Sequence, residues 1–168
     1  SHRLVFVAGA PDRPAAVFTL DPDSGDLEVL SASPPHIPDP GYTSGARPIS
    51  FPTGGGQVAH ALFYPPRNPD FEAPEGSRPP LIVISHGGPT SNTTSEFFLP
   101  RQFWTSRGFA VVDVNYRGST GYGRAYRELL NGTWGVVDVE DCIAAAKNLV
   151  GQGEADGDRL IIRGGSAG

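Results

Sequence analysis

The sequence lacks three features that would point to a secreted, a membrane or a nucleic-acid-binding protein. It has one cysteine in 168 residues, so no internal disulfide can form, and we expect a cytoplasmic protein. No apolar run approaches the roughly 20 residues that span a bilayer. The net charge is −5, and no basic stripe is present, so nothing suggests nucleic acid or a membrane surface as a partner.

The remaining composition is typical of a globular piece. Hydrophobic residues make up 38% and charged residues 18% of the chain, which excludes a disordered tail. The length suffices for one core, although α/β enzymes usually need more residues. The single Cys142 lies in a helical pattern and is interpreted as a small buried hydrophobe.

The most informative motif closes the sequence. An apolar run, Leu160–Ile162, leads through Arg163 into Gly164-Gly165-Ser166-Ala167-Gly168. This is the G-x-S-x-G pattern of a nucleophile elbow, in which a strand turns sharply and only small neighbours fit around the strained serine. The motif alone is weak evidence, because a Gly-rich turn after a buried strand gives the same letters.

A second glycine-rich turn strengthens the hydrolase interpretation. The apolar run Pro80–Ser85 ends in His86-Gly87-Gly88-Pro89, which has the place and composition of an oxyanion loop. Acyl transfer builds negative charge on a carbonyl oxygen, and fixed backbone N–H groups stabilise it. We predict Gly88 and Ala167 as the two donors and Ser166 as the nucleophile.

Periodicity predicts an open α/β sheet in which strands alternate with helices. Ile143, Ala146, Leu149 and Val150 are expected to face the sheet from the last helix. The predicted strands are 3–8, 16–20, 27–30, 46–52, 57–64, 80–85, 109–114 and 159–163; the predicted helices are 97–107, 124–130 and 139–150; residues 33–41 are a proline-rich linker.

Other polar features receive structural interpretations. The Gly-rich loop 115–123 lacks the lysine of a P-loop and the spacing of a Rossmann fingerprint, so nucleotide binding is not expected. His60 alternates along a strand and is interpreted as structural, as are Asp138 and Asp141 near a helix start. No cofactor or metal is predicted.

Taken together, several motifs resemble the prolyl oligopeptidase family of serine peptidases, with most similarity to its dipeptidyl-peptidase and acylaminoacyl-peptidase branch. The resemblance covers about residues 45–168, and its motifs are His86–Thr90, Phe103–Gly123, Trp134-Gly135 and Gly164–Gly168.

The resemblance implies the N-terminal part of an α/β-hydrolase catalytic domain over 36–168, ending at the elbow. Residues 1–35 would be the remnant of the last β-propeller blade and the start of the linker. It implies short peptides as substrates, Ser166 as nucleophile, and Gly88 and Ala167 as oxyanion donors. It places Arg117 and Tyr122 near the active site, without a catalytic step.

The chain order of the family has a consequence for activity. The catalytic acid and histidine of α/β-hydrolases follow the serine, whereas His86 precedes it and suits a structural role. We therefore expect these 168 residues to be inactive alone, with the missing half supplied by a second polypeptide or by a longer protein. The elbow strand would otherwise expose an apolar edge. Homo-oligomer formation is compatible with the sequence.

Three functions are consistent with these residues. The first is a serine exopeptidase or oligopeptidase that acts through an acyl-enzyme on Ser166. The second is a carboxylesterase or lipase on the same scaffold, because a triad does not distinguish amides from esters. The third is a non-catalytic hydrolase-fold protein that serves in protein association.

Overall fold

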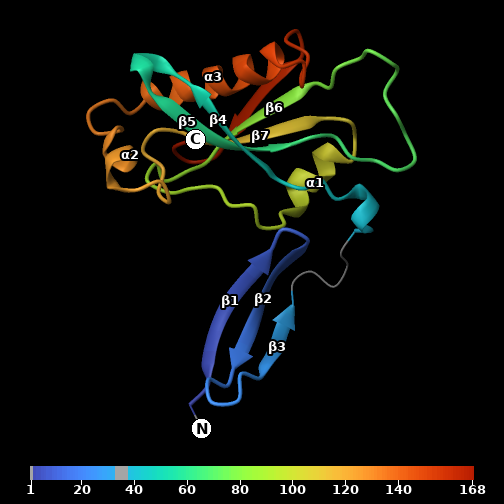
Figure 1. Ribbon diagram of the computed structural model, residues 1–168, viewed down its shortest axis with the longest axis vertical. Coiled ribbons are helices and arrows are strands. Elements are labelled where there is room, and N and C mark those ends of the chain that lie inside the picture. Colours follow the sequence, from blue (N-terminus) through green and yellow to red (C-terminus); the bar gives the residue numbers. More distant parts are fainter. Residues whose placement is uncertain (1, 33–37) are drawn as a thin grey trace.

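The computed structural model describes residues 2–32 and 38–168, which form two separate β-sheets (Figure 1). Residues 33–37 of the predicted linker lie outside the described residues. The end of that linker forms a 3-10 turn, η1 (Pro40–Tyr42), which begins where the Asp39 carboxylate accepts a hydrogen bond from Gly41 N at 2.7 Å. The linker therefore ends in a defined turn before the second sheet begins.

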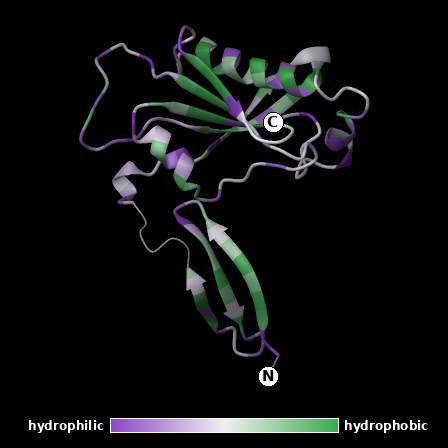
Figure 2. Ribbon diagram, turned by 180° about the vertical axis from the view of Figure 1, so that it is seen from behind, coloured by the Kyte–Doolittle hydropathy of each residue, from purple (hydrophilic) through white to green (hydrophobic). Residues whose placement is uncertain are grey.

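The first sheet is an antiparallel meander of β1 (Leu4–Ala10), β2 (Arg13–Leu20) and β3 (Leu27–Ala32). All three predicted strands are present, each longer than expected. The apolar stretches of β1 and β2 are evident in Figure 2, yet Val5 and Val7 are 65% and 70% exposed. Within the described residues this apolar surface is uncovered, as expected for strands that bury little by themselves.

The second sheet has five strands in the order β4-β5-β7-β6-β8. The predicted hairpin is confirmed as β4 and β5, joined through the 3-10 turn η2 (Gly54–Gly56), and β5 pairs antiparallel with β7. The remaining pairs, β6 with β7 and β6 with β8, are parallel. The bounds are β4 (Arg47–Pro52), β5 (Val58–Tyr64), β6 (Leu81–Ser85), β7 (Ala110–Asn115) and β8 (Leu160–Gly164).

The pairing register of β6 with β8 positions the candidate site. Leu81 of β6 pairs with Leu160 of β8, and Ser85 pairs with Gly164 at the other end of both strands. Because the two strands are parallel and end together, the loops that follow them leave the same edge of the sheet. The His86 loop and the Ser166 turn are therefore neighbours in space.

The three helices match the predicted ones with shifted ends: α1 (Leu99–Thr105), α2 (Arg124–Glu128) and α3 (Val137–Gly151). α1 begins two residues later than predicted. Phe97 instead donates its backbone N–H to Ala10 O of β1 at 2.9 Å, and Phe98 is extended. That segment therefore connects the two sheets rather than extending the helix.

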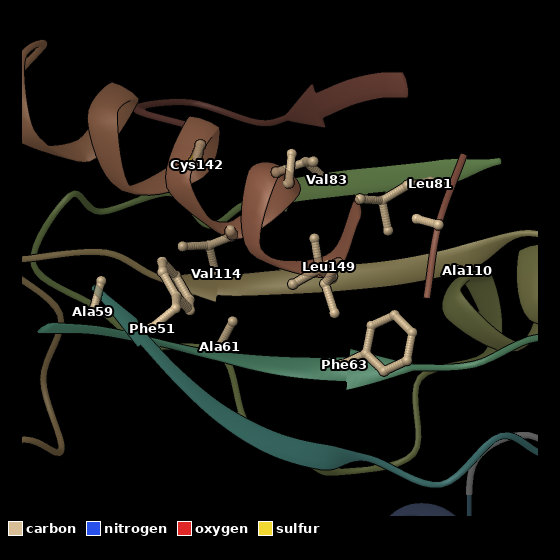
Figure 3. Packing of buried hydrophobic residues seen from close by; sticks show 14 of the residues in the cluster. Phe51, Ala59, Ala61, Phe63, Leu81, Val83, Ala110, Val114, Cys142 and Leu149 are labelled. Carbon is tan, nitrogen blue, oxygen red and sulfur yellow. The ribbon is translucent and has the colours of Figure 1, made fainter. Parts of the chain in front are cut away.

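The core lies mainly between α3 and one face of the five-stranded sheet (Figure 3). Cys142, Ala145, Ala146 and Leu149 of α3 pack on this face, at the spacing of one helix stripe. The prediction that Ile143 faces the sheet is wrong, since Ile143 is 49% exposed. At about 100° per residue, Ile143 lies roughly 160° around the helix from Ala145, outside the arc that Cys142, Ala145, Ala146 and Leu149 bury.

The interpretation of Cys142 as a small buried hydrophobe is confirmed. Burial raises the pKa of the Cys142 thiol to about 11, so the residue is a buried hydrophobe rather than a reactive thiol.

β8 pairs only with β6 among the described residues, and Leu160, Ile161 and Ile162 are 46%, 46% and 69% exposed. α1 covers the opposite face, where Trp104 and Phe109 pack beside Tyr64 and Val111. No helix in the described ranges is long and apolar enough to cross a membrane.

We expect Phe63→Ala and Phe71→Ala to differ sharply in stability. Phe63 is fully buried in the α3 face of the sheet, whereas Phe71 lies in the 65–80 loop and is 77% exposed. Removing a buried phenyl group should lower the free energy of unfolding by about 3–5 kcal/mol, and removing the exposed one by less than about 0.5 kcal/mol. Thermal or urea unfolding of the protein that carries this chain measures both, and equal losses would contradict the assigned core.

Candidate functional site

Ser166 occupies a strained turn directly after β8. Its φ is +60°, and among the described residues it alone combines a side chain with a positive φ. Gly168 N donates to Gly165 O at 3.0 Å and closes the turn. A left-handed non-glycine residue costs about 1–3 kcal/mol, and the glycine and alanine neighbours leave room for it. The serine is exposed, as a reactive hydroxyl must be.

Gly87 lies against this turn. A Cβ atom placed on Gly87 would be 2.9 Å from Gly165 O and 3.3 Å from the Ser166 Cβ, so only glycine allows the loop after β6 to approach this closely. Gly88 follows with a φ of +133°, again in the region that favours glycine. The structure thus brings the His86–Pro89 loop and the Ser166 turn together, as the paired motifs suggested.

Two backbone N–H groups in this corner make no hydrogen bond within the described residues. Neither Gly88 N nor Ala167 N donates to an acceptor within 2–32 and 38–168. A pair of unused N–H groups on two loops that meet beside an exposed serine is the arrangement that can stabilise a developing oxyanion.

His86 is engaged on both sides of its ring. Its Nδ1 lies 2.8 Å from Gly87 O, and its Nε2 lies 2.8 Å from Ser119 Oγ. Because a carbonyl oxygen only accepts, Nδ1 carries a proton. With one nitrogen on its own loop and the other on the loop after β7, the geometry favours the structural role expected for His86.

Arg117 is held in a buried ion cluster. Its Nε donates to Asp141 Oδ1 at 3.0 Å, its backbone N donates to Asp141 Oδ2 at 2.7 Å, and its Nη2 donates to Glu140 at 2.9 Å. Asp141 is fully buried and also accepts from Thr53 Oγ1. Asp138 accepts from Gly135 N near the start of α3. Both aspartates therefore stabilise the packing of α3.

Tyr122 belongs to an aromatic cluster on β5. Its ring stacks on His60 with centroids 4.3 Å apart, and its hydroxyl accepts from Asn115 Nδ2 at 3.1 Å. His60 Nδ1 lies 2.9 Å from Ser50 Oγ. Burial lowers the pKa of His60, although the Asp141 charge opposes this, so the imidazole is kept neutral in a packing role.

The sequence interpretation missed the side chains that support the candidate oxyanion loop. Tyr116 and Ser119 contact His86, and the Asn115 amide holds Thr93 through both its backbone N and O. The only sequence signal for these residues is their position: Asn115 ends β7, the strand next to β6, and Tyr116 and Ser119 follow it. No metal-binding group of three or more His, Cys, Asp or Glu side chains is found among the residues described.

Comparison with known proteins gives a consistent result. Residues 95–168 match the profile of the prolyl oligopeptidase family. A puromycin-hydrolyzing peptidase from Mycobacterium tuberculosis superposes with a TM-score of 0.94 at 49% identity, over 98% of this chain and 25% of that one. The Pyrococcus horikoshii acylaminoacyl peptidase gives a TM-score of 0.76 at 27% identity, over 98% and 26%.

Curated sequences agree. Dipeptidyl aminopeptidase BIII of Pseudoxanthomonas mexicana is 28% identical over 98% of this chain and 24% of its own length. The acylamino-acid-releasing enzyme of Arabidopsis thaliana is 39% identical over 55% of this chain and 12% of its own length. The chain thus spans about a quarter or less of the length of these relatives.

We expect the two carboxylates on Arg117 to differ in their contribution to stability. Asp141→Asn leaves a buried guanidinium without its main counter-charge and should cost about 3–5 kcal/mol of unfolding free energy. Glu140→Gln removes a partner that is 48% exposed and should cost less than about 1 kcal/mol. Unfolding midpoints of the two variants test this, and a cost for Glu140→Gln as large as for Asp141→Asn would show that the buried pair is not the anchor.

Proposed function

The chain belongs to the prolyl oligopeptidase family, and from this premise we propose that it carries the nucleophile half of a serine peptidase active site. The observation that carries the proposal is the strained Ser166 turn packed against Gly87. Residues 36–168 are then the N-terminal part of an α/β-hydrolase catalytic domain, and residues 1–35 are the end of the last β-propeller blade. The exposed apolar strands β1 and β2 are compatible with such a blade.

The proposed reaction is the acyl-enzyme route of serine peptidases. Ser166 Oγ attacks the substrate carbonyl carbon while its proton passes to an imidazole base. The negative charge that forms on the carbonyl oxygen is bound by Gly88 N–H and Ala167 N–H, each worth about 3–4 kcal/mol of transition-state stabilisation. The imidazolium then protonates the leaving amine as the C–N bond breaks. Water hydrolyses the acyl-enzyme and restores the serine.

Neither His60 nor His86 is assigned as the base, because both rings are engaged in other contacts. His86 uses one ring nitrogen on Gly87 O within its own loop and the other on Ser119 Oγ of the loop after β7, and His60 stacks on Tyr122. In α/β-hydrolases the acid and the histidine follow the serine. We infer that residues beyond these 168 supply them, from a longer protein or a second polypeptide, and that this chain is inactive alone.

Short peptides are the proposed substrates. Similar proteins are named acylamino-acid-releasing enzyme, dipeptidyl aminopeptidase and puromycin hydrolase, and these names support peptide-like substrates. An exopeptidase or oligopeptidase acting through an acyl-enzyme on Ser166 is therefore the preferred function. No cofactor enters the reaction.

A carboxylesterase on the same scaffold is the second candidate, because ester and amide hydrolysis share the oxyanion geometry. Aminoacyl p-nitroanilides and p-nitrophenyl esters distinguish the two when given to the complete protein. Turnover of esters alone would defeat the peptidase proposal. The absence of both activities would favour a non-catalytic role in protein association.

Ser166→Ala in the complete protein should lower kcat for an aminoacyl p-nitroanilide by at least about 1,000-fold, since the nucleophile is lost while the oxyanion donors remain. Ser106→Ala, at a half-buried position directly after α1 and outside the candidate site, is the matched control and should change kcat by less than about twofold.

Fluorophosphonate labelling read by intact mass provides the second measurement. The wild type and the Ser106→Ala variant should gain one label, and the Ser166→Ala variant should gain none. Unchanged turnover by Ser166→Ala, or labelling at another serine, would contradict the assignment of the nucleophile.

A further inference from the structure

A buried tyrosine hydroxyl brackets the candidate oxyanion loop. Tyr116 directly follows β7 and is 1% exposed. Its Oη lies 2.9 Å from His86 O and 3.1 Å from Pro89 O. One hydroxyl proton can be shared between two acceptors as a three-centre hydrogen bond. The same oxygen therefore holds the main chain on both sides of Gly87 and Gly88.

This bracket encloses two successive glycines, Gly87 and Gly88. Two successive glycines have the widest choice of backbone conformations, and fixing them costs more entropy than fixing other residues. A candidate donor such as Gly88 N–H contributes to catalysis only if it already points at the position of the oxyanion. A clamp on both flanking carbonyls supplies that order before substrate binds.

The imidazole of His86 completes the clamp. Its Nδ1 contacts Gly87 O, which belongs to the same peptide group as Gly88 N. In a planar trans peptide, fixing the direction of the C=O also fixes the direction of the N–H. The Tyr116 ring stacks on this imidazole with centroids 4.3 Å apart and an interplanar angle of 17°. Tyr116 thus acts on the loop through its hydroxyl and through His86.

We propose that Tyr116 is a positioning residue for peptide hydrolysis, which orients the Gly88 N–H as an oxyanion donor by holding His86 O and Pro89 O. The inference rests on the proposed function. Burial raises the pKa of the Tyr116 phenol to about 12, so the hydroxyl keeps its proton, and with it the ability to donate, throughout the neutral range.

Two other buried tyrosines provide matched controls. Tyr126 Oη donates to Asn115 O at 2.7 Å, one residue before Tyr116 and outside the His86–Pro89 loop. Tyr64 Oη has no partner within the part of the chain that the structure describes. Each Tyr→Phe substitution removes one oxygen atom from a buried ring, but only Tyr116→Phe releases the candidate oxyanion loop.

The test compares Tyr116→Phe, Tyr126→Phe and Tyr64→Phe in the complete protein. Tyr116→Phe should lower kcat for an aminoacyl p-nitroanilide by about tenfold to a hundredfold, with KM changed by less than about twofold, because orientation matters most in the transition state. It should raise the Ki of a peptide aldehyde, which forms a tetrahedral adduct, by a similar factor. Both control variants should keep kcat within about twofold of the wild type.

Replacement of Tyr116 by 4-aminophenylalanine should restore most of the lost kcat, because its two N–H donors reach the same carbonyls. It also replaces Tyr116→Phe as the decisive variant if the phenylalanine variant does not fold. Wild-type kcat in Tyr116→Phe, an equal loss in Tyr126→Phe, or no recovery with the amino analogue would overturn the inference. An active Ser166→Ala variant would instead refute the proposed function, so the two failures are distinguishable.

Discussion

The parallel pairing of β6 with β8 is the constraint on which the site depends. Ser85 and Gly164 face each other at the ends of these strands, and the residues that follow each strand are the ones proposed to carry the chemistry. A shift of the register by one residue would reverse which side chains face α3 and would move Gly87 away from Ser166. Burial of Leu81, Val83 and Ala110 beneath α3 opposes such a shift.

Segments that carry no reactive group maintain this arrangement. The loop after β7 contributes Tyr116 and Ser119 to the side of the His86 loop, while Arg117 points the other way into the Asp141 cluster. These residues belong to one turn, in which Ser119 N–H donates to Tyr116 O at 2.9 Å, so neighbouring side chains of a single turn serve two purposes. The Arg117–Asp141 ion pair fixes the loop after β7 to α3. The Tyr116 hydroxyl fixes the His86–Pro89 loop to the loop after β7.

Much of this organisation could be predicted from the sequence, because it depends on local patterns. The strands, the hairpin around Gly54–Gly56 and the three helices follow from periodicity and turn residues, and the two glycine-rich motifs indicated which loops should meet. The orientation of α3 was predicted less well, since Ile143 and Cys142 are both apolar and only the packed sheet decides between them. The start of α1 depended on a hydrogen bond to Ala10, far away in the chain.

The supporting hydrogen bonds could not be predicted for a similar reason. Nothing in the run from Asn115 to Gly123 reveals that Tyr116 reaches His86 O and Pro89 O, because that contact requires β6 and β7 to lie side by side. Roles assigned from motif position alone, such as those of Arg117 and Tyr122, stay predictions, whereas their contacts with Asp141 and with His60 are structural features.

The register of β6 and β8 also has a consequence for the order of folding. The two strands are about eighty residues apart in the chain, and parallel pairing at such separation is slow because the loop between them must be ordered first. The β4–β5 hairpin and the helical turns of α3 form through hydrogen bonds between residues close in the chain. We therefore expect the corner around Ser166 to assemble after the rest of the sheet. A newly made chain would then present its serine as an ordinary flexible hydroxyl until the scaffold around it is complete.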